Sequence, residues 1–213
     1  MQLLRSAPES RSASLFYYLV RALSSRGRRR WPASRFLPPL CYLQRIRPMS
    51  TTALTSADFR RVVGNFATGI TVITVEREPG QVHGMTANSF ASVSLDPLLI
   101  LVCIDHNARL LSFLKEQGRF GVNILKDSQQ AVSEHFAKPL QEPEATKSLG
   151  IRFLWTSSGI PLIHDALAHL ACNVAAEYPA GDHTLFIGEV ESMDVSPGEP
   201  LLYHRGQYRR LQP

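Results

Sequence analysis

The stretch GMTANSFASVSLDPLLILVCI, residues 84–104, constrains the fold more than any other part of the chain. Along its first half, small polar residues alternate with apolar ones. Because successive side chains of a strand point to opposite faces, this alternation predicts a strand over 84–94 with one apolar and one neutral polar face. The almost uniformly apolar run 98–104 predicts a second strand, buried on both faces. The polar face carries Thr86, Asn88, Ser92 and Ser94.

The rest of the body predicts an antiparallel β-barrel with a few helices. Apolar residues at positions 59, 62, 63 and 66 indicate a short amphipathic helix, and 107–117 reads as a helix with Asn107 as its cap and Gly118 as its stop. A third helix is predicted over 127–138, and residues 139–159 are left as a connection. Strands are predicted over 70–76, 119–125, 160–165, 166–180, 184–195 and 200–211.

Three helices among so many strands do not suit alternating βαβ units. No G-x-G-x-x-G motif follows a strand and no P-loop occurs, so a separate Rossmann domain is not expected.

The first 49 residues differ in composition from the body. They hold ten Arg, no Lys and one acid, whereas residues 50–213 carry a net charge of −4. This Arg- and Ser-rich segment is typical of mitochondrial transit peptides, and we expect a disordered targeting segment followed by one domain over 50–213. A plastid or cytoplasmic location, and an unselected extension with Met49 as a second start, are the alternatives. The run RGRRR would attract phosphate groups, although we expect no nucleic acid partner.

Neither a metal site nor a membrane span is expected. The seven histidines show no H-x-x-x-H or H-E pair, and no apolar run approaches the roughly 20 residues that span a bilayer. The three cysteines, Cys41, Cys103 and Cys172, are far apart, which favours inert or pocket-lining thiols over a disulfide.

The polar face of 84–94 has two interpretations. One face of an antiparallel sheet is commonly solvated, and Ser and Thr are frequent there. A solvated face usually also recruits Lys, Glu or Arg, and none occurs across these eleven residues. Hydroxyl and amide groups on such a surface would suit a flat polar ligand that approaches the strand closely.

Three blocks of the chain together resemble the flavin reductase-like family. These are FRRVVGNFATGITVITV with GMTANSFASVSLDPLLILVCIDHNARLLSFLKEQGRFGVNIL, then GDHTLFIGEV, and finally LLYHRGQYRRL. The resemblance covers residues 56–211 and implies an FMN-binding split β-barrel of the Greek-key type. It also implies a homodimer, with the flavin near the subunit interface.

The resemblance further implies which residues contact the flavin. Thr86, Ala87, Asn88 and Ser89 would meet the isoalloxazine or ribityl chain, and Ser92 and Ser94 would lie toward the phosphate. Further contacts would come from Cys103, Asp105, Asn107 and Arg109, and then from Phe120 and Asn123, for which a core aromatic and a turn-capping amide are equally good interpretations. The terminal candidates are Tyr203, Arg205 and Tyr208.

The implied activity is an NAD(P)H-dependent flavin reductase that passes hydride to FMN, FAD or riboflavin and can supply a partner monooxygenase. In the GDH block, Gly181 would form a turn, Asp182 would cap it and His183 would face the nicotinamide. His183 would position the nicotinamide or stabilise developing charge. A flavin sensor or carrier on the same barrel is the alternative. A pyridoxamine-phosphate oxidase-like or haem-degrading barrel is disfavoured, because the 84–94 strand has no basic phosphate clamp.

Overall fold

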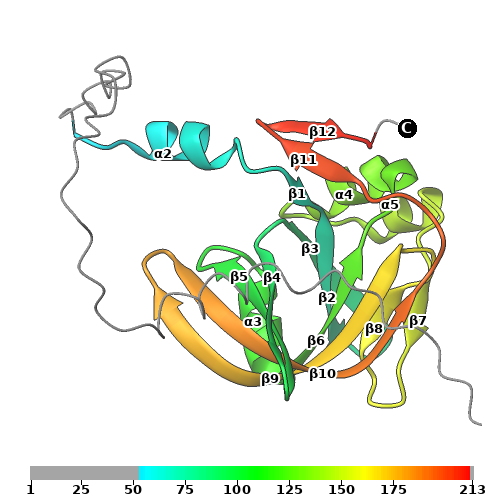
Figure 1. The fold of residues 1–213 in the computed structure, drawn as a ribbon. Helices are drawn as coiled ribbons and strands as arrows, with labels where there is room; N and C mark the ends of the chain where they lie inside the picture. The colour runs from blue at the N-terminus through cyan, green and yellow to red at the C-terminus, as the bar shows by residue number, and fades with distance from the viewer. Residues whose placement is uncertain (1–52, 212–213) are drawn as a thin grey trace, which may run out of the picture. The chain divides into compact units, whose positions relative to one another are not determined.

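The computed structural model of the chain describes residues 53–211, so the predicted targeting segment and Cys41 lie outside the described residues. The described part is mainly β, as predicted (Figure 1). Its helices are α2 (Ser56–Val63), α3 (Leu110–Gln117), α4 (Gln130–Phe136) and α5 (Pro143–Ser148), with a short 3₁₀ turn η2 (Asp127–Gln129). Its strands are β1 (Thr68–Gly69), β2 (Thr71–Glu78), β3 (Gln81–Ala87), β4 (Phe90–Leu95), β5 (Leu98–Asp105), β6 (Arg119–Ile124), β7 (Phe153–Trp155), β8 (Pro161–Ile163), β9 (Ala168–Ala180), β10 (His183–Val195), β11 (Leu202–His204) and β12 (Gln207–Arg209).

A seven-stranded antiparallel sheet dominates the fold, in the order β3-β2-β6-β9-β10-β5-β4. Its strands are strongly curved, most visibly in the long β9–β10 hairpin (Figure 1). β3 and β4 are consecutive in the chain but lie at opposite edges of this sheet. Three Cα–Cα steps, about 11 Å, join the last residue of β3 to the first of β4. The sheet must therefore curl until its two edges approach, which produces an open barrel in which β3 and β4 do not pair.

The prediction of one continuous strand over 84–94 is wrong. The chain leaves β3 at Ala87, and Asn88 and Ser89 carry it to the opposite edge of the sheet, where β4 begins. Ser89 secures this crossing, because its hydroxyl donates to the carbonyl of Cys103 at 3.0 Å and accepts from the Cys103 N–H at 3.2 Å. The alternation of polar and apolar residues is interrupted only at Ser89 and Phe90 and resumes in the same phase at Ser92, so it did not reveal a change of strand partner.

The prediction that the run 98–104 is buried on both faces is also wrong. Ile100, Val102 and Ile104 point into the core, whereas the side chains between them are only partly covered. The reason is the position of β5, which lies second from the edge of the sheet, where the core of the described part of the chain covers only its inner face.

The main core fills the interior of the curved sheet. Ile73, Val102, Phe120 and Phe186 meet there, and α3 closes one side with two fully buried leucines, Leu110 and Leu114. Helix α3 ends at Gly118, which has a φ of 64° and so confirms the predicted stop. The predicted cap is wrong, because α3 begins after Arg109, and Asn107 lies in the preceding turn.

A second cluster joins β2, α4 and the C-terminal strands, with Val72, Leu125 and Phe136 at its centre. The segment 139–159, for which no element was predicted, forms α5 and β7 and so provides a fourth helix. Within residues 53–211, no helix is long and apolar enough to cross a membrane.

Candidate functional site

Three adjoining cavities follow β3 and together form one trough. We name them the charged, middle and apolar cavities, with volumes of about 360, 250 and 430 Å³. The charged and middle cavities share Met85, Thr86 and Ala137 in their walls, and the middle and apolar cavities share Asn88 and Tyr203. Each volume is of the size that binds small molecules in proteins.

The trough exists because a helix, and not another strand, covers the outer edge of β3. The Thr86 hydroxyl donates to the carbonyl of Ser133 in α4 at 2.7 Å. Gly84 lets the helix approach, since a Cβ there would lie 2.5 Å from the ring of Phe136. Helix α4 and the residues that follow it therefore form one wall of the trough, and β3 forms its floor.

The charged cavity brings together two cations from different parts of the fold. Arg109 comes from the turn between β5 and α3, and Lys138 follows α4. The one carboxylate in its wall, Asp105, is occupied by the turn itself, because its Oδ1 accepts from the backbone N–H of Asn107 at 2.7 Å and from its Nδ2 at 3.1 Å. Two cations and one carboxylate leave the wall of this cavity with a net positive charge, which suits an anionic group such as a phosphate.

His83 also lines the charged cavity, and it is neutral at neutral pH. Burial first, and then the positive charges of Arg109 and Arg77, lower the pKa of His83 from its ordinary value to about 4. Its ring packs edge-on against Phe113, with the ring centroids 5.3 Å apart. The imidazole therefore offers this cavity a hydrogen-bonding group without a third positive charge.

The middle and apolar cavities are lined mainly by aromatic, aliphatic and small polar side chains, and one cation, Arg60, lines the apolar cavity. Tyr203 and Tyr208 pack edge-to-face at 5.6 Å, and the Tyr208 hydroxyl lies 3.0 Å from that of Ser133. Among the described residues, the Thr68 hydroxyl is the one buried side-chain polar atom without a hydrogen-bond partner, and Thr68 lines the apolar cavity. Buried polar atoms normally have partners, so this hydroxyl fits the polar edge of a flat ligand.

About half of the predicted cofactor-binding residues line the trough. They come from β3, the β5–α3 turn and the C-terminal strands, and they are Thr86, Ala87, Asn88, Asp105, Asn107, Arg109, Tyr203 and Tyr208. The structure places Ser89, Ser92, Ser94, Cys103 and Arg205 outside the walls of the three cavities. Ser89 and Cys103 secure the crossing described above, and Ser92 lies exposed on β4. Ser94 accepts from the Asp96 N–H, and Arg205 donates to the side chain of Asn65.

The assignment of Phe120 and Asn123 to the pocket is wrong. Phe120 is fully buried against Gly188, where a Cβ would lie 2.6 Å from its ring. Asn123 is also fully buried, and its amide donates to Val72 and Thr74 and accepts from the Ile163 N–H. A ligand can reach neither side chain, because Phe120 is enclosed in the main core and Asn123 is enclosed on the opposite face of β6, toward β8.

Several residues of the trough carried no signal in the sequence. Nothing in the sequence pattern set His83, Thr68 or Met85 apart as residues of a site. Ser133, Ala137, Lys138 and Gln141 come from α4 and the segment after it, which was read only as a helix and a connection. Their part in the site depends on how α4 packs on β3, and local sequence does not encode that contact.

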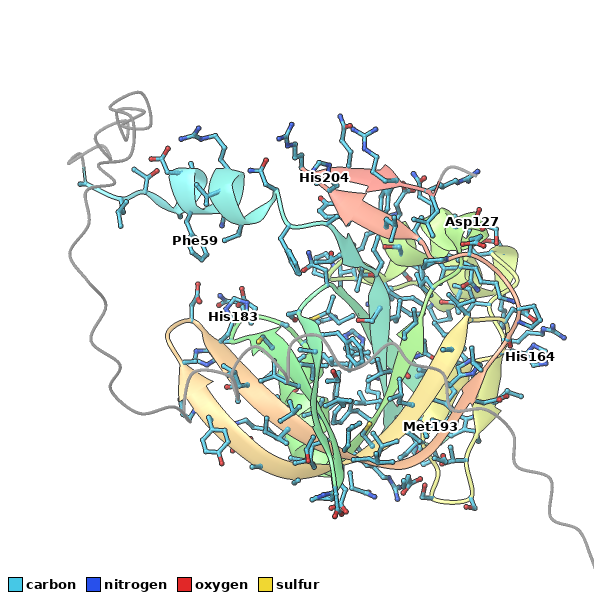
Figure 2. The ribbon with its side chains drawn as sticks, viewed as in Figure 1. Phe59, Asp127, His164, His183, Met193 and His204 are labelled. Carbon is cyan, nitrogen blue, oxygen red and sulfur yellow. The ribbon has the colours of Figure 1, made fainter. Side chains whose placement is uncertain are left out.

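His183 lies at the tip of the β9–β10 hairpin, beside the turn at Gly181, which has a φ of 65° (Figure 2). Its Nδ1 lies 2.7 Å from a carboxylate oxygen of Asp182, and this hydrogen bond is the main reason why the pKa of Asp182 is lowered. The pairing leaves Nε2 available to a ligand. Across the sheet His183 pairs with Asp105, a residue of the charged cavity, but His183 itself lines none of the three cavities.

Neither thiol nor metal chemistry is indicated in the part of the chain that the structure describes. Cys103 and Cys172 are free thiols, and burial raises the pKa of both, that of Cys172 to about 12. Both are therefore protonated at neutral pH. Across residues 53–211 no group of three or more His, Cys, Asp or Glu side chains is placed to hold a metal ion.

Comparison with known proteins shows the family of the chain. Residues 63–212 match the flavin reductase like domain. An NADH-dependent flavin reductase of a Rhodococcus species is 44% identical over 161 residues, which cover 75% of this chain and 88% of that protein. An NADH-dependent FAD reductase of Streptomyces globisporus is 41% identical, over 72% of this chain and 85% of that protein.

Solved structures show the same fold. The flavin reductase PheA2 has a TM-score of 0.69 and 44% identity, and the match covers 75% of this chain and all of that one. The NADH:FAD oxidoreductase SgcE6 of Streptomyces globisporus, in complex with NAD and FAD fragments, has a TM-score of 0.67 and 38% identity, over 74% of this chain and 93% of that one.

Proposed function

The chain belongs to the flavin reductase-like family, and from this premise we propose that it is an NADH-dependent flavin reductase. The observation that carries the proposal is the trough along β3, which joins a cavity with two cations to two cavities lined mainly by aromatic, aliphatic and neutral polar groups, with Arg60 at the wall of the apolar cavity. A flavin nucleotide has the same division, with a phosphate at one end and a flat ring at the other. Relatives whose names state NADH-dependent flavin reduction support the choice of NADH.

The residues present fit a flavin nucleotide in one orientation. Arg109 and Lys138 would hold its phosphate in the charged cavity, at the opposite end from the apolar cavity. The ribityl chain would pass Thr86, and the ring would lie against Asn88 and Tyr203. Charge favours this orientation, because the charged cavity offers a phosphate two cations, whereas the apolar cavity offers one, Arg60, and the walls of the middle cavity offer none. FMN and FAD share this part of their structure, so either would be bound in this way.

The bound groups supply the redox chemistry themselves, since a hydride passes from C4 of the reduced nicotinamide to N5 of the flavin. The chain contributes binding and orientation. The floor of β3 and the tyrosine pair would exclude water from one face of the ring. His183, with its Nδ1–H held by Asp182, would accept a hydrogen bond through Nε2 at the nicotinamide.

We also propose that the reduced flavin leaves the chain and serves a partner monooxygenase. HsaB of two strains of Mycobacterium tuberculosis, 39% identical to this chain, is named as the reductase subunit of a flavin-dependent monooxygenase, which supports this role. The trough supports it too, because its walls include exposed residues such as Asn88 and Lys138.

The decisive experiment adds NADH to the full-length protein and a hundredfold excess of FMN without oxygen. The absorption band of oxidised FMN is expected to disappear completely and to return when air is admitted. Complete reduction of the excess FMN requires release of the product, which also tests supply to a partner. Bleaching of only one FMN per chain would contradict release, and bound but unbleached FMN would favour a flavin carrier or sensor.

We further propose that the chain forms a homodimer through α2. None of the residues of this helix is buried, and its apolar side chains are uncovered: Phe59 is 67% and Val62 65% exposed. Phe59 projects from the helix in Figure 2. An amphipathic helix normally buries its apolar face, so a second copy of the chain is a suitable cover.

The dimer is testable by light scattering coupled to gel filtration. The unaltered protein is expected to have the mass of two chains, and Val62→Glu is expected to shift it to the mass of one. Val195→Glu is the matched control, because Val195 is exposed to a similar degree, 73%, but lies at the end of β10. A monomeric unaltered protein, or an equal effect of both substitutions, would contradict the assignment to α2.

A further inference from the structure

One glutamine side chain acts as a strand partner for the free edge of β3. The Nε2 of Gln141 donates to the carbonyl of Gly84 at 2.6 Å, and its Oε1 accepts from the N–H of Gly84 at 3.2 Å. A side-chain amide thus satisfies both backbone groups of one residue, as a neighbouring strand would. The same Nε2 lies 3.3 Å from the carbonyl of Lys138 and so also closes the turn that contains that lysine.

This contact holds the part of the wall that carries a cation. Residues 137–141 lead from α4 to α5, and all of them except Leu140 line the charged cavity together with Arg109. Helix α4 itself is held by the Thr86–Ser133 bond and by Phe136 over Gly84, and His135 binds Thr146 of α5 at 3.0 Å. Between these two attachments, the bonds of Gln141 are the ones that join the segment to β3.

We propose that Gln141 is a positioning residue that holds Lys138 at the phosphate of the flavin nucleotide, so that the chain favours flavin nucleotides over riboflavin. The proposal rests on the proposed function, because it takes the ligand of the trough to be a flavin. Gln141 acts through the backbone of its turn and needs no contact of its own with the ligand. A long, flexible lysine side chain gains more from binding a phosphate when its backbone is already ordered, because less conformational entropy is lost.

The test compares the affinities for FMN and riboflavin, which differ only in the phosphate. Dissociation constants are measured by quenching of flavin fluorescence for the full chain and for Gln141→Ala. We expect Gln141→Ala to weaken FMN binding by about tenfold, the size of one charge-assisted hydrogen bond, and to leave riboflavin binding within twofold. In steady-state kinetics the KM for FMN should rise by a similar factor, with kcat changed less than twofold.

Two further variants make the test specific. Lys138→Met removes the cation without touching Gly84, and it should reproduce the selective loss of FMN affinity. When both substitutions are combined, the loss should be no greater than that of Lys138→Met alone, since the two residues act as one unit. Gln81→Ala is the matched control. Gln81 is an exposed glutamine at the start of β3, and its amide forms hydrogen bonds with the side chains of Arg77 and Glu78.

Equal weakening of FMN and riboflavin by Gln141→Ala would overturn the proposal, because it would show that the glutamine only supports the wall. Additive losses in the double variant would overturn it as well. Absence of binding of either flavin to the unaltered chain would overturn the proposed function itself, and this outcome is distinct from a failure of Gln141 alone.

Discussion

Replacing Ala137 with phenylalanine is expected to weaken flavin binding by about 10- to 100-fold. Ala137 follows the last residue of α4, and it lines both the charged and the middle cavity. A phenyl ring at this junction would occupy the passage that a flavin nucleotide must fill between phosphate and ring. Such overpacking typically costs about 1–3 kcal/mol, which corresponds to this range of dissociation constants.

The fold should tolerate the substitution, because Ala137 is exposed in the absence of a ligand. Ala131→Phe is the matched control. Ala131 is an exposed alanine of the same helix and lines none of the three cavities. Titration with FMN and thermal unfolding of both variants separate the two effects. Unchanged FMN affinity in Ala137→Phe, at an unchanged melting temperature, would rule out the trough as the flavin site.

Replacing His183 with alanine is expected to lower kcat/KM for NADH by about tenfold while leaving the FMN dissociation constant nearly unchanged. The magnitude corresponds to one hydrogen bond lost at the nicotinamide, about 1–1.5 kcal/mol. Flavin affinity should survive because His183 lines none of the three cavities. The hairpin tip should keep its shape, since the backbone bond from the His106 N–H to the Asp182 carbonyl, at 3.0 Å, does not involve the imidazole.

The chain offers a close control for this substitution. His164 is also an exposed histidine paired through Nδ1 with the aspartate beside it, at 2.8 Å, and its side chain is 41% exposed compared with 40% for His183. His164→Ala should therefore leave NADH oxidation unchanged. A loss of FMN binding in His183→Ala would assign the histidine to the flavin, and equal activity of the two variants would remove it from the site.

Local signals predicted those parts of the fold that depend on neighbouring residues. The stop of α3 at Gly118 and the hairpin turn at Gly181 were predictable because a glycine with positive φ leaves a mark in the sequence. The strands followed from their two-residue alternation. The same alternation hid the crossing at Asn88 and Ser89, since two strands with similar patterns on opposite edges of a sheet look continuous.

The residues of the candidate site were also predicted only in part. Thr86, Asn88, Asn107 and Arg109 were predicted from a resemblance to the family, and the structure places all four in the walls of the trough. The prediction failed for Asn123, because an amide looks the same in the sequence whether it meets a ligand or, as here, three backbone and side-chain partners in the core.

By itself, the amino-acid sequence determined the β class of the fold, the family and the neutral surface of β3, because these depend on periodicity and on motifs that are local in the chain. Only the tertiary structure decided which residues face that surface. Lys138 and Gln141 reach the charged cavity because α4 packs on Gly84, more than 50 residues earlier in the chain. Such contacts depend on how the shapes of both segments fit together, and the residue pattern of one segment alone does not predict that fit.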